Sequence, residues 1–249
     1  MPFAVLQTDL NPPTLEQLQR AFRHVPGLTA SDGHILGRDA YGVLVKNFPA
    51  EHAVALQGAL RIEGVETEIV DESYLPAMPP GKQINRLDCV PEHLLIYDPL
   101  GRSFPLPWPH VMLIAAGMAR VTEFVRVPEE SRKVRFNMNG GAYVEHRTEY
   151  HSREERNEQC VAEIIISGAV LRYSINAERF NFMSLGGRRT GDATQDFALL
   201  IQDLARFATN AVLNRGAEAI RRNQPFAYPT RNAFQEEIVW TLWQMKKRA

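Results

Sequence analysis

The sequence predicts an α+β protein made of two modules, and three observations lead to this prediction. Strand-like and helix-like segments alternate over the first 72 residues. A stretch rich in proline, YLPAMPPGKQ at 74–83, then interrupts the pattern, as is typical of a boundary between modules. Beyond it, short strand candidates follow one another closely and end in an amphipathic helix at 192–213. We therefore predict modules at 1–78 and 79–224 and a helical extension at 225–249.

The residue pattern of the first module predicts four strands and two helices. Thr14 can cap a helix over 15–22, and Pro49 and Gly64 are placed to begin and end a second helix. Strands are expected where short segments are rich in aliphatic and aromatic residues, at 3–8, 34–38, 41–48 and 65–72. The resulting order, β-α-β-β-α-β, is the ferredoxin-like plan, an antiparallel sheet with both helices on one face.

The second module is a run of strand candidates followed by one helix. Asp192 can cap this helix, and apolar residues recur along it at intervals of three and four. This order resembles the pleckstrin-homology-like (PH-like) domain over residues 80–213, which implies an antiparallel barrel or sheet closed by a C-terminal helix. The segment LPWPHVMLIAAG at 106–117 is similar to the strand that carries a buried tryptophan in such domains. A charged insertion is expected at about 127–158.

The pairing of the two halves, with FNFMSLGGR at 180–188 ahead of the helix, also resembles uncharacterised two-module bacterial proteins. That resemblance implies a fold and no chemistry. The chain departs from the PH-like domains that bind phosphoinositides, because its first hairpin offers only Lys82 and Arg86 as basic residues. We therefore expect no binding of lipid headgroups.

Composition narrows the class of protein. The 249 residues carry a net charge of −1, whereas nucleic-acid binders usually have a basic excess. The longest apolar run, 111–119, is about half of a membrane span. Two cysteines, Cys89 and Cys160, and a first segment without a basic region favour a cytoplasmic protein. We expect a protein partner or a small ligand, no nucleic acid or membrane, and no cofactor.

The stretch EHRTEYHSREE at 145–155 combines histidines and glutamates that could bind a metal or transfer protons. His146 and His151 are five residues apart, which corresponds to roughly 140° of rotation on a helix and to opposite faces of a strand. A site would need His146 with Glu149, or His151 with Glu155, and a further ligand from elsewhere. A solvated arm with local ion pairs is the favoured interpretation.

Two glycine-containing loops are candidate ligand sites. SLGGRRTGD at 184–192 places Arg188 and Arg189 just before a helix, where backbone amides could meet an anion. SDGHILGRDAYG at 31–42 places polar side chains between predicted strands. The candidates there are Asp32, His34 and Arg38. A connecting loop without a ligand is the simpler interpretation of both segments.

The last segment predicts a helix with one apolar face. Phe234, Ile238, Trp240 and Trp243 recur on it at short intervals. This face could pack on the rest of the chain, or on a second copy to form a homodimer.

The sequence contains no G-x-G-x-x-G, G-x-S-x-G or C-x-x-C motif and no EF-hand loop. We therefore expect a non-catalytic cytoplasmic binding or scaffold protein. The alternatives are a metal-dependent hydrolase or lyase with a site within 146–155, and a structural protein that self-assembles through its last helix.

Overall fold

The computed structural model describes the backbone of residues 1–136 and 142–248, and the side chains of these residues except for 30, 35 and 121–156. The chain consists of two compact units, Met1–Ala119 with Gln159–Ala249, and Arg120–Glu158. Helices and sheets are both present, so the α+β class is confirmed. None of the helices described is long and apolar enough to cross a bilayer.

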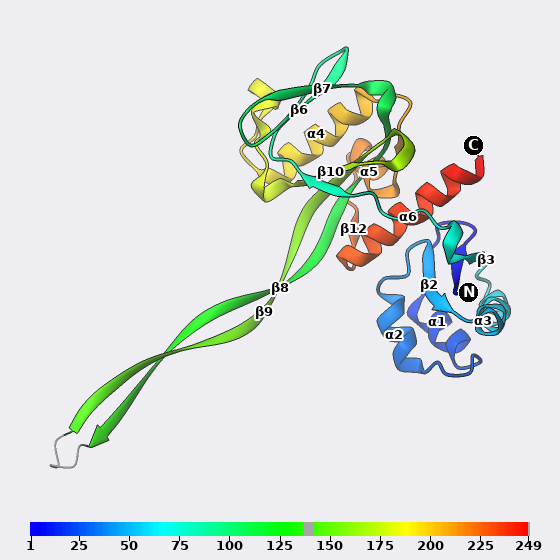
Figure 1. Ribbon diagram of the computed structural model, residues 1–249, viewed down its shortest axis with the longest axis horizontal. Coiled ribbons are helices and arrows are strands. Elements are labelled where there is room, and N and C mark those ends of the chain that lie inside the picture. Colours follow the sequence, from blue (N-terminus) through cyan, green and yellow to red (C-terminus); the bar gives the residue numbers. More distant parts are fainter. Residues whose placement is uncertain (137–141, 249) are drawn as a thin grey trace. The chain divides into compact units, whose positions relative to one another are not determined.

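The first part of the larger unit contains a three-stranded sheet with helices beside it (Figure 1). Both neighbours of the central strand are antiparallel to it, in the order β2-β1-β3. The elements, in chain order, are β1 (Phe3–Gln7), α1 (Leu15–Phe22), α2 (Ala30–Gly37), β2 (Val43–Phe48), α3 (Ala50–Ile62) and β3 (Thr67–Asp71).

The strand expected at 34–38 is wrong, because this segment is part of helix α2. The reason is a capping box that starts the helix. The Thr29 hydroxyl accepts a hydrogen bond from the backbone N–H of Asp32, and the Asp32 carboxylate accepts one from the backbone N–H of Thr29. With this strand replaced by a helix, the sheet has three strands where the ferredoxin-like plan needs four.

The two faces of this sheet are buried by different helices. Val5 on β1 belongs to a core with Phe22 of α1 and Leu56 of α3. Ala4 and Leu6, which point to the opposite face, belong to a core with residues of the last helix, α6 (Arg231–Arg248). This alternation follows from the two-residue period of a strand.

The rest of the larger unit contains two further sheets. One is the meander β5-β6-β7, and the other has the order β11-β8-β9-β10-β4, with β12 also paired to β8. None of the described sheets closes into a barrel. The elements are β4 (Gly81–Gln83), β5 (Leu87–Cys89), β6 (His93–Tyr97), β7 (Ser103–Pro107), β8 (Val111–Phe136), β9 (Ala142–Ile166), β10 (Arg172–Asn176), α4 (Ala193–Phe207), β11 (Val212–Leu213), α5 (Arg215–Arg221) and β12 (Ala227–Tyr228).

Helix α4 lies in the largest core and contacts both of these sheets. Its residues Leu200 and Leu204 share this core with Leu94 of β6 and Ile164 of β9. Trp108 is buried, as the sequence predicts, and its ring stacks on Phe207 at a centroid distance of 5.5 Å. The Trp108 indole N–H also donates a hydrogen bond to the carbonyl of Val90, at 2.8 Å.

The smaller unit, Arg120–Glu158, is built from the outer parts of β8 and β9, which pair as a two-stranded ribbon (Figure 1). At its base, the Arg120 guanidinium and the Glu158 carboxylate form an ion pair at 3.1 Å. The predicted charged insertion falls within this ribbon.

Candidate ligand site beside helix α4

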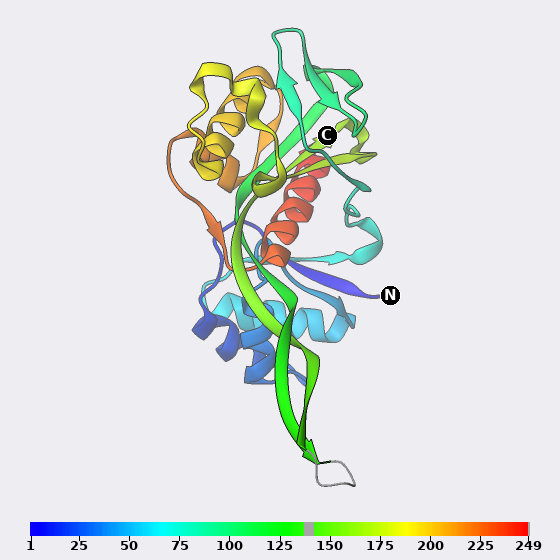
Figure 2. The same cartoon turned by 90° about the vertical axis from the view of Figure 1, so that its left-hand side faces the viewer.

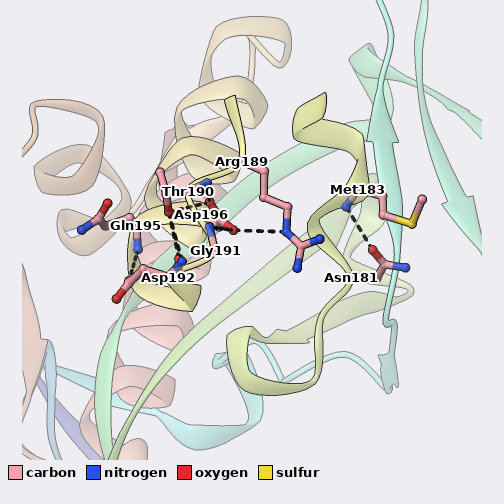
Figure 3. Close-up of polar contacts among 8 residues, drawn as sticks. All are labelled: Asn181, Met183, Arg189, Thr190, Gly191, Asp192, Gln195 and Asp196. Atoms are coloured by element: carbon pink, nitrogen blue, oxygen red, sulfur yellow. Dashed lines mark hydrogen bonds and ion pairs between the residues drawn. The ribbon is translucent and has the colours of Figure 1, made fainter. Parts of the chain in front are cut away.

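A tightly bonded loop precedes helix α4 (Figure 3). A 3₁₀-helix, Phe182–Arg188, follows Asn181, whose side chain accepts a hydrogen bond from the backbone N–H of Met183 at 3.0 Å. Gly186 within this turn has a φ of 54°, a conformation that glycine adopts without strain. At the far end, the Asp192 carboxylate caps α4 by accepting from the backbone N–H of Gln195, which confirms the predicted cap.

Asp196 fixes this loop to the first turn of α4. Asp196 is 1% exposed, and its carboxylate accepts hydrogen bonds from the Thr190 backbone N–H at 2.7 Å and the Thr190 hydroxyl at 2.9 Å. The Gly191 N–H donates to it at 3.3 Å, and the Arg189 Nε lies 3.6 Å from it. Burial acts to raise the pKa of Asp196, but these donors together lower it below its ordinary value.

The two arginines predicted as anion ligands both pair with acids of α4. Arg189 pairs with Asp196, and Arg188 forms a two-pronged ion pair with Asp203, in which Nη1 lies 3.0 Å from Oδ1. Asp196 and Asp203 are seven residues apart, so they lie on the same side of the helix. The hydrogen bonds from Arg188 raise the pKa of its guanidinium above the ordinary value. Neither arginine therefore offers an unopposed charge.

A pocket of about 290 Å³ opens beside the Arg188–Asp203 pair. We call it the α4 pocket. Its lining consists of Cys89, Ser184, Arg188, Leu200, Asp203, Arg206 and Phe207.

Two groups in the α4 pocket have no polar partner among the described side chains, one buried and one exposed. The Ser184 hydroxyl oxygen is buried and has no hydrogen-bond partner within the described residues. The Arg206 guanidinium lies 5.6 Å from the centroid of the Phe207 ring and forms no ion pair with any acid in the described part of the chain. With Arg188 opposed by Asp203, the pocket carries a net positive charge that comes from Arg206.

Cys89 adds no reactive group to the α4 pocket. Burial, followed by the nearby negative charges of Asp203 and Asp88, raises the pKa of its thiol to about 12. The thiol therefore stays protonated at neutral pH, and a protonated thiol is a poor nucleophile.

The candidates of the 31–42 segment are dispersed. Asp32 is used in the capping box of α2, where hydrogen bonds from Thr29 lower its pKa. His34 is exposed on α2, and Arg38 is the residue that caps the C-terminal end of this helix. The segment is a helix and its C-terminal turn, and the structure does not bring these three side chains together in a site.

The candidate metal ligands lie on strand β9. They are His146, Glu149, His151 and Glu155, and their side chains are outside the described residues. Elsewhere, the described side chains include no group of three or more histidine, cysteine, aspartate or glutamate residues that could hold a metal ion.

The apolar residues of the last helix contact the chain itself, on two faces of α6. Phe234 and Ile238 are fully buried in a core with residues of β8 and β9. The indole N–H of Trp240 donates to the Gln7 carbonyl at 2.7 Å, and that of Trp243 donates to the Glu68 carboxylate at 2.9 Å. The prediction of one apolar face is therefore wrong, and in this chain α6 lies between two sheets (Figure 2).

The sequence alone did not reveal Ser184 or Arg206 as site residues. Ser184 lies within the predicted loop, but a serine there resembles any turn residue. Arg206 is an exposed residue of α4, and in the sequence nothing distinguishes it from other surface arginines. The chain matches no protein-family model, no curated protein and no solved structure, so the geometry of the α4 pocket is the basis for assigning a function.

Proposed function

We propose that the protein binds a small anionic molecule in the α4 pocket, as a cytoplasmic binding protein without catalytic activity. The observation that carries this proposal is the buried Ser184 hydroxyl without a partner, in a pocket that also contains the unopposed guanidinium of Arg206. A buried polar group without a hydrogen bond is unfavourable by about 1–3 kcal/mol, and a ligand that bonds to it recovers this free energy.

The donors of the α4 pocket favour a carboxylate or a phosphate. A guanidinium presents several N–H groups in one plane and binds such oxyanions through two parallel hydrogen bonds. The Ser184 hydroxyl can add a third donor. Asp203 limits the charge of the ligand, because its own carboxylate lines the same pocket. A singly charged anion suits this balance better than a multiply charged one.

The volume limits the size of the ligand. At about 290 Å³, the α4 pocket is at the lower end of the range of small-molecule sites, about 300–1,000 Å³. Leu200 and Phe207 offer apolar contacts on one part of the lining. We therefore propose an acid with a short apolar substituent.

The proposal includes three broader features. The order of strands followed by α4 supports a module that is PH-like in plan, although none of the described sheets closes into a barrel. The two free cysteines suit a reducing cytoplasm. The three-stranded sheet of the first module supports a reduced form of the ferredoxin-like plan.

The test is a thermal-shift titration with small carboxylates and inorganic phosphate, at an ionic strength held constant with NaCl. A ligand that binds only the folded state stabilises it by about 2.7 kcal/mol at a hundredfold excess over its dissociation constant. The variants are Arg206→Gln and Ser184→Ala. The matched control is Arg61→Gln, which alters an arginine of α3 with an exposed side chain.

We expect at least one anion to stabilise the wild type and the control but not Arg206→Gln, and to stabilise Ser184→Ala more weakly. Stabilisation of equal size in Arg206→Gln would show that the anion binds elsewhere. No stabilisation of the wild type by any of the acids would also reject the proposal.

A further inference from the structure

A second pocket lies at the N-terminal end of helix α4, and its walls carry no charge. It has a volume of about 250 Å³ and lies between the first turns of α4 and the segment 220–226, which leads from α5 to β12. We call it the α5 pocket. Its described lining consists of apolar, sulfur-containing and uncharged polar residues, with no acidic or basic side chain among them.

Aromatic rings and sulfur atoms form the inner wall of the α5 pocket. Phe197 of α4 and Cys160 of β9 are buried, and Phe226 and Met118 are partly buried. Aromatic rings attract one another in offset-stacked or edge-to-face pairs, and a thioether sulfur packs favourably against the edge of a ring. These walls therefore favour an aromatic ring in the pocket.

Uncharged amides line the outer part of the α5 pocket. The side chains of Gln195, Asn223 and Gln224 are exposed there. Figure 3 shows the Gln195 side chain pointing away from the loop that Asp196 fixes. The Asn223 side-chain oxygen accepts a hydrogen bond from the Gln202 amide at 2.8 Å, which leaves the Asn223 N–H groups available. Because an amide both donates and accepts, these groups suit a neutral polar substituent on the ligand.

The electrostatics of the α5 pocket disfavour a charged ligand. Burial raises the pKa of the Cys160 thiol, and the negative charges of Asp192 and Glu178 raise it further, although a hydrogen bond with Thr194 acts to lower it. The thiol is therefore protonated and uncharged at neutral pH. The described lining offers no basic group to a carboxylate and no acidic group to an ammonium ion. A charged ligand would lose hydration and gain no paired charge.

The volume of the α5 pocket fits one substituted ring. A cavity of about 150 Å³ holds a benzene molecule. At about 250 Å³, the α5 pocket has room for a benzene ring and a substituent of a few atoms.

We propose that the α5 pocket binds a neutral aromatic molecule that carries one amide, carbonyl or hydroxyl group. Phe197, Phe226 and Met118 contact the ring, and the amides of the outer part bond to the polar group. No described residue lines both this pocket and the α4 pocket, and the two ligands differ in charge. The inference does not depend on the proposed function.

The test follows the side-chain methyl signal of Met118 by nuclear magnetic resonance. The full chain is labelled with carbon-13 at the methyl groups of its seven methionines, and Met118→Leu identifies the signal of Met118. The probes are benzamide, its charged relatives benzoate and benzylamine, and cyclohexanecarboxamide, which has a saturated ring. The movement of the Met118 signal gives each dissociation constant. Met118 does not line the α4 pocket, so an acid that binds there is distinguished from one that binds here.

Two variants with matched controls locate the binding. Ala198→Leu fills the α5 pocket from α4, and Ala55→Leu changes a partly buried alanine of α3 in the same way. Gln195→Ala removes one exposed amide of the pocket, and Gln83→Ala removes an exposed amide on β4. The exposed position of Gln195 makes its variant informative even if Ala198→Leu does not fold.

We expect benzamide to move the Met118 signal and to bind about tenfold more tightly than benzoate or benzylamine, because both charged groups lose hydration. Cyclohexanecarboxamide should bind at least about twofold more weakly than benzamide, since it lacks the aromatic contacts. Ala198→Leu should abolish the binding of benzamide, and Gln195→Ala should weaken it about threefold. Both controls should bind benzamide as the wild type does.

Three results would overturn the proposal. The first is a Met118 signal that does not move near the solubility limit of benzamide. The second is binding of benzoate, benzylamine or cyclohexanecarboxamide that is as tight as that of benzamide. The third is an affinity for benzamide that Gln195→Ala, or a folded Ala198→Leu, leaves unchanged.

Discussion

Asn214 shows how much of this fold depends on single buried residues. Its side-chain oxygen accepts hydrogen bonds from the backbone N–H of Ala217, which begins α5, and from that of Ala116 on β8. Its amide donates to the Tyr228 hydroxyl at 2.8 Å. One side chain thus joins α5, β8 and β12. In the sequence, Asn214 is an ordinary helix cap, and the strand that it also bonds is almost one hundred residues away.

Gly216 permits the close approach of α5 to β8. A Cβ atom at this position would lie 1.9 Å from the carbonyl oxygen of Ala116, which is backbone and cannot move aside. We predict that Gly216→Ala lowers the free energy of unfolding by at least about 2 kcal/mol. Gly58, on α3, has no atom within 4 Å of the same position, so Gly58→Ala should raise the free energy of unfolding by about 0.5–1 kcal/mol. Urea denaturation of both variants measures this, and equal effects would contradict the packing argument.

Glu237 makes stability depend on pH. Burial raises the pKa of its carboxyl above the ordinary 4.5, although the Arg215 backbone N–H donates to it at 2.9 Å. The folded state therefore holds this proton more tightly than the unfolded state does. The contribution of this proton to the free energy of unfolding is fully present below pH 4.5, and it is lost as pH rises through the raised pKa.

We predict that Glu237→Gln flattens the decline in the free energy of unfolding as pH rises above 4.5. Glutamine keeps an oxygen that can accept the Arg215 N–H, so the effect of charge is isolated. Urea unfolding across this pH range is the measurement. A decline as steep as that of the wild type would show that Glu237 does not cause it. Burial also raises the pKa of Glu163, so we expect Glu163 to cause part of the decline that remains in this variant.

At the scale of elements, the sequence predicts most helices and strands of the first module, but not which other parts of the chain they contact. Helices α1 and α3 and strands β1, β2 and β3 occur where hydrophobic periodicity and caps predict them. Helix α2 was missed because Thr29 and Asp32, which form its capping box, also look like turn residues. The two apolar faces of α6 were merged into one, because periodicity shows where apolar residues lie but not how many surfaces they meet.

Helix α6 is predicted to be essential to the larger unit. Ile238 is fully buried against the sheet that contains β8 and β9, so Ile238→Ala should lower the free energy of unfolding by about 2–5 kcal/mol. Arg248, exposed at the end of the same helix, is the control, and its replacement by alanine should change the value by less than about 0.5 kcal/mol. Denaturant unfolding of both variants checks this. A small effect of Ile238→Ala would mean that α6 is not part of the core in solution.

At the scale of the whole molecule, we expect the two units to differ in whether each folds without the other. The residues of the four described cores all lie in Met1–Ala119 or Gln159–Ala249. A two-stranded ribbon alone is at best marginally stable in water. The segment 120–158 also contains eight glutamates and eight arginine or lysine residues, so these charges balance. The sequence predicts its charge pattern, but its length as a ribbon emerges only from the pairing of β8 with β9.

We predict that the larger unit folds without the ribbon. Residues 121–157 can be replaced by Asn-Gly, which favours a tight hairpin turn, between the paired Arg120 and Glu158. The shortened chain should melt within about 4 °C of the full chain, which corresponds to less than about 1 kcal/mol. Calorimetry measures the midpoint, and circular dichroism of the excised peptide should show little strand. A collapse of the shortened chain would show that the ribbon supports the larger unit.

The position of α6 between two sheets has a consequence for protein synthesis. The strands of both sheets leave the ribosome before residues 231–248, yet one face of each sheet is completed only by this helix. Until α6 emerges, the nascent chain exposes two apolar sheet surfaces at once, and such surfaces attract other unfinished chains. At a translation rate of about 5–20 residues per second, this exposure lasts for seconds. The helix that joins the two sheets therefore also sets the interval during which a chaperone would be needed.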